Sequence, residues 1–179
     1  MKKIVFLLAL IAAFSACQQS RYTDAELLKN EIAALEKKLL ETGDASKDKQ
    51  TALLLIEKTK QFAKHNPQDP QTPVLLFKAA DAARGAAEYG KAIYLWGQVW
   101  RNYGEHPQAP MALFLQGFTF DSDLRDAKMA TQYYQDFLTH YPDDPLADQV
   151  TQLLAVVAVS PEDLVKQFEK QSPVEPENE

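Results

Sequence analysis

The chain has 179 residues, with 19 basic and 25 acidic side chains and a formal net charge of −6 at pH 7. This acidic balance argues against a nucleic-acid partner, because affinity for nucleic acid comes largely from phosphate neutralisation by Lys and Arg. The chain holds only 6 glycines, and alternating runs of β-branched residues are scarce. Together these features predict an all-α fold.

The first sixteen residues have the three parts of an export signal. Lys2 and Lys3 form a basic start, residues 4–14 are an unbroken apolar run, and Ser15 and Ala16 are small. Eleven helical residues rise only ~16 Å, about half of a ~30 Å hydrocarbon core, so the run is too short to span a membrane. The pattern predicts a signal peptide over residues 1–16.

Cys17 is the only cysteine, so no disulfide can form within the chain. Its place directly after Phe14-Ser15-Ala16 resembles the lipobox of bacterial lipoproteins, with Phe14 where the pattern has an aliphatic residue. The resemblance implies a lipid-modified Cys17 at the mature N-terminus. Gln18 at the next position implies an outer-membrane anchor facing the periplasm. The alternative is ordinary secretion with cleavage after Ala16.

Residues 23–42 are predicted to form an amphipathic helix, with Thr23 and Glu26 as a capping box. Its apolar side chains recur at spacings of four, three and four residues, at Leu28, Ile32, Leu35 and Leu39. We expect this helix to pair with residues 47–65 as a degenerate first repeat. A short coiled coil is the alternative.

The middle of the chain repeats itself, because residues 92–110 align without a gap on the segment that begins at residue 130. The matched pairs are Ala92 and Ala130, Trp96 and Tyr134, Val99 and Phe137, Tyr103 and Tyr141, and Pro107 and Pro145. A fainter copy lies upstream, with Leu55 and Phe62 at the positions of Ala92 and Val99. Each copy ends in a turn punctuated by proline, which stops a helix.

A further helix is predicted before each of the two better copies, over Thr72–Arg84 and Ala109–Phe120. Gly85 and the cluster Asp121-Ser122-Asp123 are expected to break the chain after these helices. A helix, a short turn, a second helix and a proline turn then make one repeating unit.

The unit resembles the tetratricopeptide repeat (TPR). Residues 133–142 contain the Y-x-x-F-L-x-x-Y-P signature of periplasmic TPR lipoproteins, which include BamD-like assembly lipoproteins and Tol-Pal-associated TPR proteins. The unit is longer than the standard TPR, and Ala79 and Gly117 match the small residue of the first TPR helix. The resemblance implies a short right-handed α-solenoid of TPR-like helix hairpins with a C-terminal capping helix.

The predicted organisation has six parts. They are a lipoprotein signal peptide (1–16), a lipid-anchored linker (17–22), an N-terminal helix pair (23–70), two TPR-like repeats (71–145), C-terminal capping helices (146–171, the second opening at Ser160-Pro161) and a disordered acidic tail (172–179).

By analogy with TPR arrays, the first helix of each repeat lines a concave groove that binds a peptide or protein segment. The predicted groove residues are Leu76, Ala80, Arg84, Phe114, Phe118 and Asp121. His65, His106 and His140 stand near helix C-termini, where an imidazole satisfies free carbonyls. The spacing of Asp121, Asp123 and Asp126 also allows calcium, although it lacks the Gly and Glu of an EF-hand loop.

No catalytic constellation or cofactor motif is found in the sequence, so no enzyme activity, metal or cofactor is expected beyond the lipid on Cys17. We expect an envelope adaptor that binds another envelope protein and reaches the membrane through its lipid. One alternative is an accessory subunit of an outer-membrane protein assembly or Tol-Pal-like machine. Another, of a different class, is a periplasmic protein that binds a metal or a small molecule.

Overall fold

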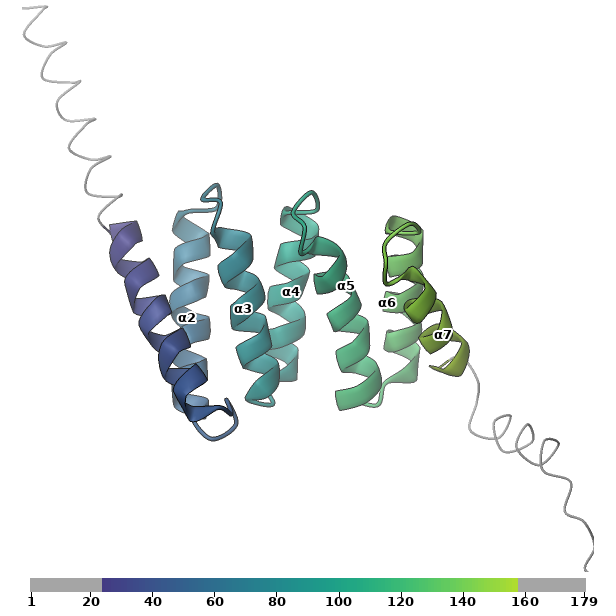
Figure 1. The fold of residues 1–179 in the computed structure, drawn as a ribbon, viewed down its shortest axis with the longest axis horizontal. Helices are drawn as coiled ribbons and strands as arrows, with labels where there is room; N and C mark the ends of the chain where they lie inside the picture. Colours follow the sequence, from purple (N-terminus) through teal and green to yellow (C-terminus); the bar gives the residue numbers. More distant parts are fainter. Residues whose placement is uncertain (1–23, 158–179) are drawn as a thin grey trace, which may run out of the picture. The chain divides into compact units, whose positions relative to one another are not determined.

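The computed structural model describes residues 24–157, and every regular element in this range is helical (Figure 1). The all-α prediction is therefore confirmed for this part of the chain. The chain divides into two compact units, the first ending at Val99 and the second beginning at Trp100. The predicted signal peptide, Cys17, the N-cap Thr23, the helix opening at Ser160 and the acidic tail lie outside the described residues.

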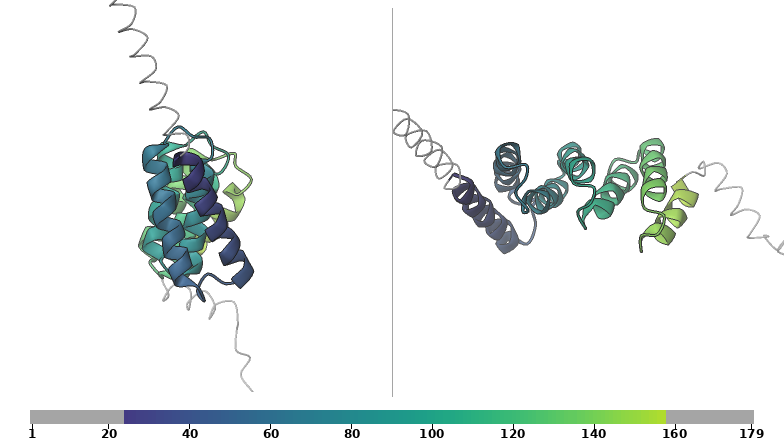
Figure 2. Two further views of the ribbon diagram at one scale, coloured as in Figure 1. Left: turned by 90° about the vertical axis from the view of Figure 1, so that its left-hand side faces the viewer. Right: turned by 90° about the horizontal axis from the view of Figure 1, so that it is seen from above.

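The first unit contains a helix over residues 24–42, then α2 (Lys49–His65), α3 (Thr72–Gly85) and most of α4 (Tyr89–Asn102). Consecutive helices run antiparallel (Figure 1). Seen from above, the helix of residues 24–42 and α3 lie on one side of the unit, and α2 and α4 lie on the other (Figure 2). The expected pairing of residues 23–42 with residues 47–65 agrees with this arrangement.

The apolar stripe of residues 24–42 faces the core of the first unit, as its spacing predicted. Ile32 and Leu39 are buried, and Leu28 and Leu35 pack against them while keeping part of their surface. Across from them stand buried side chains of α2, of which Phe62 is the largest. Full burial of one such side chain stabilises the fold by about 1.5–3 kcal/mol, so this stripe holds the first helix in place.

The second unit contains α5 (Ala109–Phe118), a π-helical turn η1 (Thr119–Asp123), α6 (Ala127–His140) and α7 (Ala147–Val157). Helix α6 packs against both α5 and α7. The hydrophobic core of the second unit includes Leu113, Phe114, Tyr134 and Phe137. The helix expected over 146–158 corresponds to α7.

The sequence repeat is visible as a repeated pattern of burial on α2, α4 and α6. Three positions, four and three residues apart, are buried in every copy. They are Leu55, Thr59 and Phe62 on α2, Ala92, Trp96 and Val99 on α4, and Ala130, Tyr134 and Phe137 on α6. The next residue is half-buried each time, at Ala63, Trp100 and Leu138.

The proline turns after these helices also share one set of hydrogen bonds. In the first turn, the amide of Asp69 donates to the carbonyl of Asn66 at 3.1 Å, and the amide of Thr72 donates to the carbonyl of Asp69 at 2.9 Å. The Asp69 carboxylate accepts from the amide of Gln71 at 2.9 Å. The third turn repeats all three bonds through Tyr141, Asp144 and Leu146. The carboxylate therefore fixes the turn that leads into the next helix.

In the second turn His106 occupies the position of these aspartates. Its Nδ1 accepts from the amide of Gln108 at 3.3 Å, so the neutral ring carries its proton on Nε2. The prediction that all three histidines serve helix carbonyls is therefore wrong for His106. It holds for His65 and His140, whose Nδ1 atoms donate at 2.8 Å to the carbonyls of Gln61 and Asp136.

The repeat gains one residue at the π-helical turn. When Thr72, which begins α3, is aligned with Ala109, which begins α5, six buried positions of α3 coincide with six buried positions of α5; on α5 they are Ala109, Ala112, Leu113, Phe114, Gln116 and Gly117. This register would place Ala92 over Met129, whereas beyond η1 Ala92 matches Ala130. A π-helical turn accommodates one extra residue, so η1 absorbs the insertion.

This register corrects two expectations. Gly117 corresponds to Ala80, and not to Ala79, as the small residue of the first helix. A Cβ at Gly117 would lie 3.0 Å from the Cβ of Tyr133 and from ring atoms of Tyr134, so a larger residue would have to displace these side chains. The cluster of residues 121–123 does not break the chain, because it lies within η1, where the hydroxyl of Ser122 donates to the carbonyl of Phe118 at 2.9 Å.

The breaks between helices fall later than predicted, at Ala86–Glu88 and Leu124–Asp126. Gly85 is the last residue of α3 and not the break. Ala87 and Arg125, which occupy the same position in their copies of the repeat, have φ values of 58° and 56°. Left-handed backbone costs a residue with a Cβ roughly 1–2 kcal/mol, which shows how firmly the hairpin geometry is imposed at this position.

We expect His106→Asp to raise the free energy of unfolding by about 0.5–1 kcal/mol, because a carboxylate accepts more strongly from the Gln108 amide and favours the positive end of α5. Equilibrium denaturation with urea measures the change. The matched control is His65→Asp, which puts the same carboxylate at the negative end of α2 and should lower stability. Equal signs for the two substitutions would contradict this account of the turn.

Candidate partner-binding surface

The predicted groove residues do not form one open surface. Leu76, Ala80 and Phe114 are buried, with exposed fractions of 3%, 0% and 7%. Their side chains serve packing between helices and cannot touch a partner in this conformation. Arg84, Phe118 and Asp121 keep part of their surface, so a contact role for these three stays a prediction.

In the second unit the partly exposed residues are tied into the core. The ring of Phe118 stacks on Phe114 with 5.8 Å between centroids, and Phe114 lies 6.3 Å from Tyr134. The Tyr134 hydroxyl donates to the carboxylate of Asp121 at 3.2 Å. Burial, and then the Asp121 charge, raise the pKa of Tyr134, so the phenol stays a donor. The π-helical turn thus presents Asp121 to a buried hydroxyl.

A trough of about 410 Å³ lies in the first unit between residues 24–42 and α3. Both helices are first helices of hairpins, which is where the resemblance to TPR arrays places a binding groove. The lining residues are Glu26, Lys29, Asn30, Ala33, Glu36, Gln71, Val74, Leu75 and Lys78. Of these only Leu75 is buried, so the trough presents a polar, open wall on both sides.

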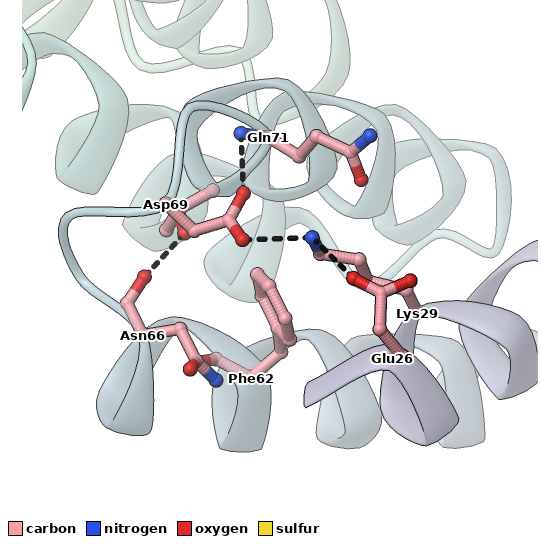
Figure 3. Close-up of polar contacts among 7 residues, drawn as sticks. Glu26, Lys29, Phe62, Asn66, Asp69 and Gln71 are labelled. Atoms are coloured by element: carbon pink, nitrogen blue, oxygen red, sulfur yellow. Dashed lines mark hydrogen bonds and ion pairs between the residues drawn. The ribbon is translucent and has the colours of Figure 1, made fainter. Parts of the chain in front are cut away.

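One end of the trough is closed by a cluster around Lys29 (Figure 3). Its ammonium group lies 2.7 Å from the Asp69 carboxylate and 3.1 Å from Glu26, and 5.5 Å from the centroid of the Phe62 ring. Because Asp69 also accepts a hydrogen bond from the backbone amide of Gln71, a single carboxylate joins the first helix to the turn before α3. The cluster therefore fixes the width of the trough at this end.

The pKa values of this pair follow from its geometry. The hydrogen bond to Asp69 raises the pKa of Lys29, against the opposing effect of burial. Burial acts to raise the pKa of Asp69, but the hydrogen bonds from Lys29 and from the Gln71 amide outweigh it and lower that pKa. Both groups are therefore charged near neutral pH, and the side chains are only 18% and 21% exposed.

At the other end, Lys78 of α3 reaches across to Glu36 at 2.8 Å. This ion pair also borders a second hollow of about 370 Å³, which is lined by Leu39, Leu40 and Ala45 from the first helix and its loop, and by Asp81 and Ala82 of α3. The bridge between Lys78 and Glu36 thus separates the polar trough from a more apolar recess.

Asp81 stands at this recess and has an unusual carboxyl group. Although the Asp81 side chain as a whole is exposed, desolvation of its carboxylate by the surrounding residues raises its pKa to about 6, against the opposing effects of the Trp96 indole and the Arg84 charge. The Trp96 ring is buried and lies edge-on to Phe77, with 6.5 Å between centroids.

Sequence reasoning missed the side chains that line the trough. The residues of α3 that face it are Val74 and Lys78, whereas the prediction named Leu76 and Ala80. The sequence does contain a signal for this solvent-facing surface. Residues 71, 74 and 78 are spaced three and four apart, so they share one face of the helix, and none carries a large apolar side chain. The pairing of Lys29 with Asp69 joins residues far apart in the sequence and leaves no periodic signal.

The acidic turn that allowed calcium is used otherwise in the structure. Asp121 accepts from Tyr134, and the carboxylate of Asp126 caps α6 by accepting from the amide of Met129 at 3.0 Å. Among residues 24–157, no three His, Cys, Asp or Glu side chains stand close enough together to hold a metal ion.

Searches for similar proteins add no family to this geometry. The sequence matches no protein-family model, and no curated protein matches it. Within the part of the chain that the structure describes, none of the helices is long and apolar enough to cross a membrane.

We expect the stability of the chain to fall as pH rises through the range in which Asp81 ionises. Its folded pKa of about 6 lies above the ordinary value of 3.8, so the folded state holds the proton more tightly than the unfolded state. This contribution is fully present below about pH 4 and is lost as pH rises through about 6. Asp81→Asn should therefore gain stability relative to the native chain between about pH 4 and pH 7.

Urea denaturation of both chains across this range measures the effect, and carbon-13 NMR of the Asp81 carboxyl gives the midpoint directly. Asp69→Asn is the comparison, because its carboxyl has a lowered pKa and contributes stability that is lost as pH falls. A midpoint near 4 for Asp81, or parallel stability curves for the native chain and Asp81→Asn, would refute the assignment.

Proposed function

We propose that this protein is a non-catalytic adaptor of the cell envelope, built as a short right-handed α-solenoid of TPR-like hairpins and tethered to the outer membrane by a lipid on Cys17. The observation that carries the proposal is the polar trough between residues 24–42 and α3, which is bounded at both ends by ion pairs. Such a trough suits an extended peptide segment of another envelope protein.

The repeated local structure supports the solenoid. Three copies of one turn follow three helices with the same three buried positions, and two of these turns share two backbone hydrogen bonds and the bond to an aspartate carboxylate. A single hairpin of this kind cannot bury its apolar face, so its copies are expected to stack in one direction and form a continuous surface from their first helices. The resemblance to periplasmic TPR lipoproteins implies the same arrangement.

The chemistry of the trough supports a peptide as the ligand. Asn30 and Gln71 are both exposed on its walls, and each amide side chain offers a donor and an acceptor. A peptide backbone carries the same two groups at every residue, so two amides on facing walls can bind it with little regard to its sequence. Ala33 and Val74 add a small apolar area between them.

The carboxylates with the lowest pKa values support a non-catalytic role. The pKa of Asp48 falls to about 2 because its carboxylate, which caps α2, accepts from Thr51 and from Lys38. The pKa of Glu88 falls to about 2 through the ammonium groups of Lys49 and Lys91. Each of these perturbed groups is explained by a structural partner.

A lipid on Cys17 would hold the trough close to the membrane. The linker of residues 17–22 spans at most about 20 Å when fully extended. Tethering to a surface raises the local concentration of a partner in the same envelope compartment, so weak backbone contacts suffice for binding. An alternative prediction is that the protein is an accessory subunit of an outer-membrane protein assembly or Tol-Pal-like machine, which would also rely on binding to another envelope protein.

We expect a photoreactive amino acid at position 33, inside the trough, to crosslink an envelope protein in living cells. The double variant Asn30→Ala with Gln71→Ala should abolish the adduct, because it removes the amides that bind the peptide backbone. It should change the free energy of unfolding by no more than about 0.5 kcal/mol, since both side chains are exposed.

The positional control is the same photoreactive residue at Lys37, whose side chain is 79% exposed and does not line the trough. Adducts of equal yield at both positions, or an adduct at position 33 that survives the double variant, would remove the trough from the proposal. Mass spectrometry identifies the captured protein.

We expect mass spectrometry of the mature N-terminus to find a chain that begins at Cys17 and carries a diacylglyceryl group. Cys17→Ser should release the protein from the membrane fraction, because the thiol is the site of lipid attachment. An unmodified Cys17 in membrane-washed protein would turn the anchored adaptor into a soluble one, and the trough experiment would be unaffected.

A further inference from the structure

Three apolar side chains on α2 and α4, on the side of the first unit opposite the trough, do not belong to its buried core. Leu54 and Tyr94 are 47% and 52% exposed, and Leu53 is half-buried. In the repeat register Leu54 corresponds to Lys91 and Met129, and Tyr94 corresponds to Glu57 and Gln132. These are outward positions at which the other copies mostly carry charged or amide side chains, so packing within the hairpins does not require Leu or Tyr there.

These side chains surround a hollow of about 650 Å³ between α2 and α4. Its floor is formed by the buried residues Ile56 and Leu95, and its walls by Leu53 and Leu54 on α2 and by Tyr94 on α4. Gly90 has no side chain, and a Cβ built there would have no atom within 4 Å. The hollow is therefore open to solvent at this point of α4. The hollow is thus apolar below, open above, and bounded by two helices.

The rim of the hollow is positively charged at the end where α4 begins. Lys91 lines the hollow at this end, and its partner Glu88 is shared with Lys49 at 2.6 Å just outside the lining residues, so two cations stand here for one carboxylate. Farther along, Lys60 is balanced by Glu57 at 3.3 Å. The first turn of α4 adds the positive end of a helix dipole. The positive rim stands on a chain whose net charge is −6.

We propose that this hollow binds an amphipathic helix of a partner protein, with its apolar ridge between α2 and α4 and with carboxylates beside that ridge facing Lys49 and Lys91. The recess between two helices has the form of a helix-binding groove, and spacings of three and four residues on the partner would place its apolar side chains against Leu54 and Tyr94. The carboxylates would complement the one net positive charge of the rim.

Two other occupants fit the hollow less well. A lipid surface would reach the exposed Leu54 and Tyr94 but would leave the apolar floor beneath them unfilled, whereas a helix ridge can fill it. A second copy bound through a two-fold axis would place the same positive rim against itself. The partner helix therefore fits best on both shape and charge.

This surface is independent of the trough. The hollow belongs to α2 and α4, and the trough belongs to residues 24–42 and α3, on the other side of the unit (Figure 2). Failure of one proposal leaves the other standing, and a protein with both could hold two partners at once.

The test is selection of a displayed library of helical peptides on the chain from Gln18 onward, with counter-selection on the variant Leu54→Glu with Tyr94→Ser. We expect the enriched peptides to carry apolar residues at spacings of three and four and an excess of Asp and Glu. Their affinity should fall about tenfold or more in Leu54→Glu, and likewise in Gly90→Trp, which fills the hollow from open space.

Two variants serve as controls. Gly90→Ala adds only a methyl group where no atom lies within 4 Å, and Leu40→Ser removes a side chain that is 80% exposed outside the hollow; both should keep the affinity. All variants alter exposed positions, so circular dichroism and thermal unfolding should match the native chain. The affinity of the selected peptides should also fall with rising salt.

The proposal is overturned if no peptide is enriched, if the enriched peptides are basic, or if they bind Leu54→Glu as well as the native chain. Two further results overturn it by assigning the hollow elsewhere. Flotation with anionic phospholipid vesicles that Leu54→Glu abolishes would assign it to a lipid surface. A concentration-dependent dimer that Leu54→Glu abolishes would assign it to a second copy.

Discussion

Burial of three positions on the second helix of each hairpin is the constraint on which the rest of the structure depends. Two helices alone cannot remove an apolar face from water, so each hairpin needs a neighbouring element to cover these positions. The side chain in the middle position grows from Thr59 to Trp96 and Tyr134, and all three are buried. The first helix must then offer a small residue to the larger rings, and Gly117 does so, since a Cβ there would lie only 3.0 Å from the Tyr134 ring.

The turns carry this constraint from one hairpin to the next. Each ends a helix at a fixed residue and begins the following one after the same length of turn, through an acceptor side chain at Asp69, His106 or Asp144. One inserted residue would rotate everything after it by about 100° on a regular helix. The π-helical turn takes up the extra residue within Thr119–Asp123, so α6 still presents Tyr134 and Phe137 to the core.

The sequence predicts most of this fold because periodicity and proline report burial and helix ends directly. The stripe of residues 24–42 follows from spacing, and the turns after α2, α4 and α6 follow from proline. The surface of α3 does not, because analogy with TPR arrays assigns a face by position in the repeat, and this repeat is longer. Which face meets solvent depends on packing, and packing uses Leu76 and Ala80 while it leaves Val74 and Lys78 at the surface.

Other features depend on contacts between distant residues and leave no periodic trace. Lys29 meets Asp69, and Lys78 meets Glu36, across long stretches of chain, and these two pairs define the trough. The role of His106 could have been predicted, since the repeat aligns this residue with Asp69 and Asp144. Comparison of copies within one chain therefore distinguishes a residue that the fold requires from one that it tolerates.

The same comparison separates the two proposed surfaces by the kind of selectivity that each can have. The trough has paired charges and two amides, so its contacts fall on groups that every peptide backbone carries, and it should discriminate weakly between sequences. The hollow has Leu54 and Tyr94 where other copies mostly have polar residues, beside an uneven charge at Lys49 and Lys91. Apolar side chains in a recess and an unbalanced charge both depend on the partner's side chains. Selectivity for one partner should therefore reside on α2 and α4, while the trough supplies affinity that many segments can share.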